Sequence, residues 1–167
     1  DGAPLNDPAE HALYFNNFHD LTSAIDSIQV QRGVGISTVG APAYGGSVNF
    51  VSPAPAADPS GDARVVLGSF DTQRASLGLR SGSLGGGFSL GGRFSYSSTD
   101  GYRDHSGSEH RTLFVHGGWQ DARSALRLTG FTASERSDMA FLAVEPEVLA
   151  DDPRFNPLDE AERDEFG

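Results

Sequence analysis

The chain has 167 residues, of which 37% are hydrophobic, 21 are glycine and only one each is tryptophan and methionine. This length suggests one domain, and this composition favours glycine-rich strands over a helical fold. The formal charge of −11 argues against nucleic acid as a partner, because phosphates require clusters of lysine and arginine. The absence of cysteine excludes disulfides, thiolate metal sites and a cysteine nucleophile.

The first 24 residues combine turn-forming residues with an aromatic stretch. Asp7-Pro8 is a turn signal. Further along, Asp20 or Thr22 is suited to cap a short helix, which we predict over residues 21–27.

Residues 25–50 are the most distinctive stretch of the sequence. Two runs of β-forming residues, 27–32 and 46–52, flank a centre that is rich in glycine. We therefore predict two strands joined by a connection that turns tightly at its glycines. The stretch 52–62 then holds three prolines, which exclude a helix or a central strand. It is predicted to be a linker.

From residue 62 the apolar residues take a period of two, which is typical of strands with one apolar face. The alternation is clearest where Phe88, Leu90, Gly92, Phe94 and Tyr96 share a face. Five strands are predicted, over residues 62–69, 72–80, 88–97, 110–119 and 124–134. The acidic remainder has no period and three prolines, and it is predicted to be a long loop.

Three stretches, in order along the chain, resemble TonB-dependent outer-membrane receptors. Residues 25–50 match a pattern of the plug domain in these receptors: I-x-x-I-x-V-x-R-G, then Y-G, then G-G-x-x-N. Residues 1–21 resemble the plug segment that precedes this pattern, with its Asp-Gly and its P-L-N-D turn. Residues 139–157 resemble an extracellular loop of one branch of the family.

The resemblance implies a mainly β fold in three parts. Residues 1–53 would be the C-terminal part of a plug domain and residues 54–61 a linker. Residues 62–167 would be the first strands of a transmembrane β-barrel, seen as an open antiparallel sheet of about five strands with a long extracellular loop over 136–167. Barrels of this family have about 22 strands, so the chain would be an incomplete part of a receptor.

The resemblance also implies a location and a function. The protein would lie in the outer membrane of a Gram-negative bacterium and take up a scarce nutrient actively, of the ferric siderophore, cobalamin or oligosaccharide class. Its partners would be TonB, through an upstream segment, outer-membrane lipid, and a small nutrient such as a metal chelate. No cofactor and no enzyme activity are expected; no Gly-x-Ser-x-Gly elbow or phosphate loop occurs.

Four arginines are candidates for functional roles. In the family, an arginine at the position of Arg32 pairs with glutamates of the barrel wall and locks the plug; the alternative is an exposed arginine at a strand end. Arg74, Arg93 and Arg127 fall opposite the apolar faces of their strands and would point into the lumen. There they could guide an anionic ligand, solvate the wall or meet carboxylates of the plug.

In family plugs, the region that corresponds to residues 6–17 forms the outward apex near bound ligand. The ligand-facing candidates there are Asn6, Asp7, His11, Tyr14, Asn16 and Asn17. The five histidines lack the spacing of a metal site, and the acidic loops lack the spacing of a calcium loop, so no metal site is predicted.

Two other functions stay open at this level. One is a soluble, secreted β-rich binding or adhesive protein that uses its acidic loop as an interaction surface; a weaker one is a β-rich hydrolase. The face formed by residues 88, 90, 92, 94 and 96 distinguishes them from the receptor. It would contact lipid in a receptor and would be packed in the core of a soluble protein.

Overall fold

The computed structural model describes residues 3–7, 9–10, 12–33 and 45–158. The fold is mainly β, as predicted. Its elements in chain order are η1 (Phe15–Phe18), α1 (Leu21–Ala24), β1 (Ser27–Arg32), β2 (Gly46–Val51), β3 (Ser60–Leu67), β4 (Gln73–Arg80), β5 (Phe88–Thr99), β6 (Ser108–Gln120), β7 (Ala125–Ser137) and α2 (Pro146–Asp151).

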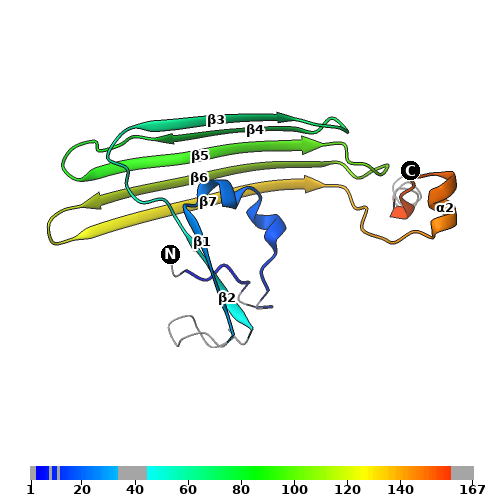
Figure 1. Cartoon of the computed structure of the whole chain (residues 1–167), viewed down its shortest axis with the longest axis horizontal. Coiled ribbons are helices and arrows are strands. Elements are labelled where there is room, and N and C mark those ends of the chain that lie inside the picture. The colour runs from blue at the N-terminus through cyan, green and yellow to red at the C-terminus, as the bar shows by residue number, and fades with distance from the viewer. Residues whose placement is uncertain (1–2, 8, 11, 34–44, 159–167) are drawn as a thin grey trace.

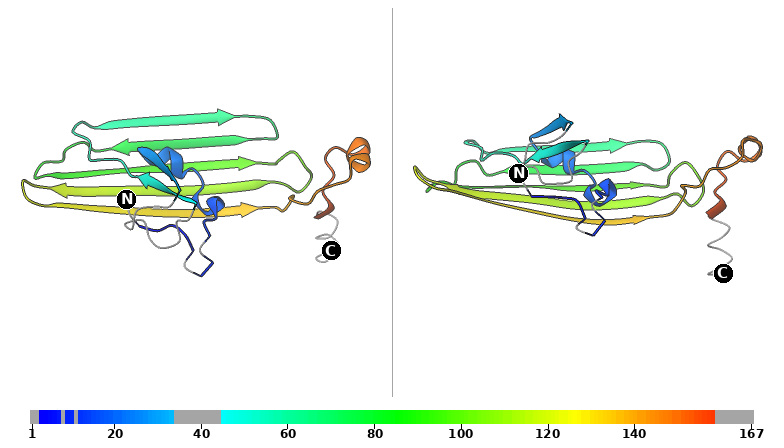
Figure 2. Two further views of the ribbon diagram at one scale, coloured as in Figure 1. Left: turned by 60° about the horizontal axis from the view of Figure 1, so that its bottom comes forward. Right: turned by 90° about the horizontal axis from the view of Figure 1, so that it is seen from below.

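The strands form two separate antiparallel sheets. β1 and β2 pair as a hairpin, and β3 to β7 form a five-stranded sheet in sequence order. The larger sheet is open, with β3 and β7 at its edges, and its strands curve gently (Figures 1 and 2). The predicted open antiparallel sheet of about five strands is therefore confirmed.

Several elements begin or end at other residues than predicted. β3 begins at Ser60, inside the expected linker, because Pro59 is the last proline before the strand. β7 runs to Ser137, and the expected loop contains α2, whose first turn begins with Pro146, a favoured position for proline. α1 ends at Ala24 rather than residue 27, because β1 already begins at Ser27.

The N-terminal elements lie against one face of the five-stranded sheet, which we call the inner face (Figures 1 and 2). The contacts include the stacked rings of Phe18 and Phe131, whose centroids are 5.7 Å apart. The strand pairings assign to this face the even-numbered residues of β3, β4 and β6 and the odd-numbered residues of β5 and β7. The opposite, outer face has no other described element against it (Figure 2).

Large apolar side chains of all five strands are exposed on the outer face. Among the described residues, the only buried hydrophobic ones are Ala24 and Phe114. Phe114 belongs to the inner face, so the apolar outer positions form no core. The exposed apolar residues of the outer face are Val65, Leu67, Leu77, Leu79, Phe88, Leu90, Phe94, Leu113, Val115, Leu126 and Leu128.

This exposure is costly in water. Burying one such side chain completely contributes about 1.5–3 kcal/mol, and these are roughly half exposed, so covering the whole outer face is worth on the order of 10 kcal/mol. That is similar to the total stability of an ordinary domain, about 5–15 kcal/mol. Soluble monomers rarely expose so extended an apolar surface.

No helix in the described parts of the chain has the length and apolar character of a membrane-spanning helix.

Asn156 joins the segment after β7 to the connection between β5 and β6. The residue is 2% exposed, and its amide nitrogen lies 2.9 Å from the carbonyl oxygen of Asp104 and 3.0 Å from those of His105 and Met139. The backbone N–H of Asp104 donates to the carbonyl of Arg154 at 2.8 Å. The two segments therefore form one unit beyond this end of the sheet.

Replacing Asn156 with alanine should loosen this unit by about 1–3 kcal/mol, because three backbone carbonyls lose a shared donor at once. Hydrogen exchange should accelerate at the amides of Asp104 and Arg154 and stay unchanged in the centre of β5. The control is Asn49→Ala, which removes an exposed asparagine. Equal exchange at Asp104 in both variants would contradict the role of Asn156.

Candidate functional site at the inner face of the sheet

Asp20 is the centre of the contact between the N-terminal segment and the sheet. It lies between η1 and α1 in the left-handed region, at φ 59°, which aspartate tolerates better than most residues. Its carboxylate accepts a hydrogen bond from the Ser23 hydroxyl at 2.6 Å, and others from the Arg74 guanidinium and the Ser95 hydroxyl. Arg74 of β4 and Ser95 of β5 are inner-face positions, so one carboxylate ties the segment to two strands.

The surroundings of Asp20 keep it ionised. Its side chain is 1% exposed, and this burial by itself raises the pKa. The hydrogen bonds from Ser23 and Ser95 and the charge of Arg74 outweigh burial, so the pKa of Asp20 lies below its ordinary value. The site is therefore a carboxylate–guanidinium pair at neutral pH.

Two histidines stack beside this pair. The rings of His19 and His110 lie 4.0 Å apart between centroids and within 9° of parallel. Among the described residues, neither Nε2 of His19 nor Nδ1 of His110 has a hydrogen-bond partner, although both atoms are buried. Burial lowers the pKa of His19, and the nearby His110 and Arg74 lower it further, while Asp20 and Glu135 act in the opposite direction.

Acid should weaken this contact. Free His19 titrates near pH 6.5, and its pKa is lower when the segment is docked, so the undocked state binds the proton more readily. The stability of the docked state is complete above pH 6.5 and decreases as the pH falls through the lowered pKa. Asp20 stays ionised over this range.

Hydrogen exchange of α1 and β1, corrected for intrinsic rates, should therefore be faster at pH 5 than at pH 7.5. In His19→Gln this pH dependence should be reduced. If α1 and β1 are equally protected at both pH values in the unchanged protein, His19 does not couple docking to pH.

The three arginines predicted to face the lumen all lie on the inner face. Arg74 forms an ion pair with the carboxylate of Asp20. Arg93 is held by Asp62 of β3 through distances of 2.5 and 2.7 Å from one guanidinium nitrogen to the two carboxylate oxygens. Arg127 lies opposite Gly118 and is exposed. Their role toward a ligand stays a prediction.

The ligand-facing candidates of residues 6–17 do not come together in one site among the described residues. Asn6, Asp7 and Tyr14 are exposed. The carboxylate of Asp7 accepts the backbone N–H groups of Glu10 and Ala9, which lower its pKa. Tyr14 donates to Glu10, and this bond raises the pKa of the phenol. His11 and the side chains of Asn16 and Asn17 lie outside the described parts.

Arg32 ends β1, paired with Gly46, and is exposed. No carboxylate of the described residues lies within salt-bridge distance of it. Its role as a lock between plug and barrel stays a prediction.

Asp20, Ser95, His19 and His110 were not predicted as functional residues. Asp20 was expected only as a helix cap, and the alternation of β5 and β6 assigns Ser95 and His110 to a polar face without naming a partner. No group of three or more side chains that could hold a metal occurs among the described residues.

A scan against models of protein families found no match. Searches of the curated proteins and of the solved structures found no significant match either.

Proposed function

We propose that the chain is part of a TonB-dependent outer-membrane receptor that takes up a scarce nutrient. One observation carries the proposal: the exposed face of the sheet is the apolar one, which is the reverse of the arrangement in a soluble protein. Its apolar face is exposed, and the N-terminal segment lies against part of its polar and cationic face. Barrel walls have this arrangement, with lipid outside and a plug inside.

The dimensions of the outer face support contact with a bilayer. Eight residues separate Phe88 from Tyr96, or about 27 Å along a strand. At the usual strand tilt of about 35–45°, this length spans about 19–22 Å across the bilayer, most of the apolar band of about 25 Å in outer-membrane barrels. Aromatic pairs lie at both ends, Phe88 with Trp119 at 6.4 Å and Phe70 with Tyr102 at 5.4 Å, as in the interfacial girdles of barrels.

The connections support an orientation. Residues 81–87 and 121–124 turn at one end of the sheet, and residues 100–107 join the segment after Ser137 at the other (Figure 1). Barrels of bacterial outer membranes have short periplasmic turns and longer extracellular loops. The end with Asn156 would accordingly be extracellular.

The contact of Asp20 with Arg74 and Ser95 would hold the plug against the wall. Energy delivered through TonB would have to break this contact, or move around it, to open a path for the nutrient. A single buried carboxylate suits that task, because it is specific in geometry yet limited to a few hydrogen bonds.

Electrophoresis of the protein, isolated as its cells make it, tests the proposal. A receptor should sediment with outer membranes, require detergent for solubility and migrate faster before boiling than after, because a closed barrel resists the detergent. A product that is soluble without detergent and migrates identically in both samples would refute the receptor and favour the secreted binding protein.

A further inference from the structure

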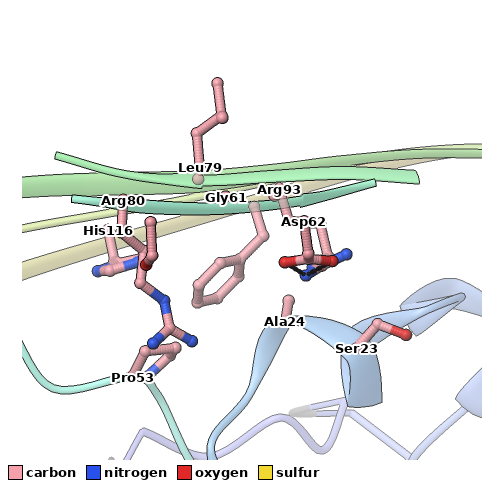
Figure 3. A pocket seen from close by; sticks show the side chains of 13 residues that line it. Ser23, Ala24, Pro53, Gly61, Asp62, Leu79, Arg80, Arg93 and His116 are labelled. Atoms are coloured by element: carbon pink, nitrogen blue, oxygen red, sulfur yellow. Dashed lines mark hydrogen bonds and ion pairs between the residues drawn. The ribbon is translucent and has the colours of Figure 1, made fainter. Parts of the chain in front are cut away.

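A cavity lies between the N-terminal segment and the inner face, next to the contact of Asp20. It encloses about 270 Å³. Ser23, Ala24 and Pro53 line it on one side, and side chains of the sheet line the other (Figure 3). This volume is slightly below the usual 300–1,000 Å³ of sites for drug-sized ligands, so it suits a smaller solute.

The charged groups of this cavity are mostly cationic. Two guanidinium groups, of Arg80 and Arg93, line it together with one carboxylate, that of Asp62, and the imidazole of His116 lies beside them. Asp62 is already engaged, because both its oxygens contact Arg93. The guanidinium of Arg80 extends toward Pro53 across the cavity (Figure 3), and no carboxylate of the described residues lies within salt-bridge distance of it.

The strand register brings Arg80 and His116 to two sides of one gap. Arg80 pairs with Gly91, and Gly91 pairs with His116, so the three residues form one row across β4, β5 and β6. A Cβ atom at residue 91 would collide with Nε2 of His116. Glycine at this position therefore leaves room for the imidazole of His116 to lie over β5.

The wider inner face has the same sign of charge. Its five strands carry five arginines and two carboxylates there, although the chain as a whole has a formal charge of −11. Phe114, 5% exposed, lines the same cavity and gives it one apolar wall. Low polarity beside fixed cations strengthens their attraction for an anion.

We propose that this cavity binds a small oxyanion, of the phosphate or short dicarboxylate class, through Arg80 and His116. A guanidinium can donate two parallel hydrogen bonds to such a group, and the imidazole can donate a third from across the gap. Arg93 lines the same cavity, and its guanidinium is held in place by Asp62. The site does not depend on the proposed receptor function, because its residues and cavity would serve a soluble protein equally.

Calorimetric titration of the purified, full-length protein with inorganic phosphate, and separately with succinate, tests the site. Arg80→Gln should weaken binding of the favoured anion at least tenfold, and Arg80→Lys should weaken it less, since lysine keeps the charge but loses the paired donors. His116→Gln should also weaken binding. The matched control is Arg64→Gln, which removes an inner-face arginine that does not line the cavity and should change affinity less than twofold.

Two results would overturn the proposal. One is no binding of either anion at millimolar concentration by the unchanged protein. The other is equal affinity in the Arg64, Arg80 and His116 variants. Where Arg80→Gln fails to fold, Arg80→Lys and His116→Gln decide the question. Failure of this site would leave detergent dependence and heat-modifiable migration unchanged, so it is distinguishable from failure of the receptor proposal.

Discussion

An arginine in place of Leu113 should destabilise the membrane-inserted protein by about 2–4 kcal/mol, the cost of a cation at the bilayer midplane of a barrel. Leu113 lies in the middle of β6, faces outward and pairs with Phe94. If lipid covers this face, the guanidinium replaces an apolar contact with hydrocarbon. Urea unfolding of the protein in lipid vesicles measures the loss.

Thr129→Arg is the matched control for this variant. Thr129 is exposed on the inner face of β7, where an added arginine meets water, so we expect a change within about 0.5 kcal/mol. A soluble protein predicts the opposite for Leu113: a charge on an exposed face should be neutral or improve solubility. Equal effects of the two substitutions would contradict the assignment of outer and inner faces.

Asp20→Ala should weaken docking of the N-terminal segment by about 2–3 kcal/mol, because hydrogen bonds to a charged group are worth about 1.5–3 kcal/mol each and a buried donor is left unpaired. Ser95 is 3% exposed and loses its acceptor. Arg74 is 39% exposed, so water replaces part of its interaction and its share of the loss is small. Hydrogen exchange of α1 and β1 should accelerate, while the centres of β5 and β6 stay protected.

Asp26→Ala is the control for Asp20→Ala. Asp26 is exposed and lies two residues beyond α1, so its removal should leave exchange of α1 and β1 nearly unchanged. If both variants behave alike, the carboxylate of Asp20 does not hold the segment to the sheet.

The sequence predicted the strands because alternation is a local property. Phe88, Leu90 and Phe94 recur at every second or fourth residue, and this spacing specifies both a strand and one of its faces. The ends of the strands, such as those of β3 and β7, were predicted less accurately, because pairing with a neighbouring strand extends a strand past its apolar residues. The short helix α2 was missed because one and a half turns leave too few residues for a helical period.

The contacts of the inner face could not be predicted in the same way. Asp20 is 54 residues from Arg74 and 75 residues from Ser95, and His19 is similarly remote from His110. Which polar residue meets which depends on how the N-terminal segment docks on the sheet, and the alternating pattern holds no information about docking. The row of Arg80, Gly91 and His116 likewise emerges only from the strand register.

Trp119 reports directly on the exposed apolar face, on which the receptor proposal depends. This is the single tryptophan of the sequence; it lies on the outer face, paired with Phe88 and Leu126. The difference in fluorescence between the unchanged protein and Trp119→Phe gives the emission of Trp119 alone, even where a longer protein contains other tryptophans. In vesicles with brominated acyl chains, we predict strong quenching of this component and little quenching by aqueous iodide. Quenching by iodide but not by brominated lipid would contradict the placement of the outer face in a membrane.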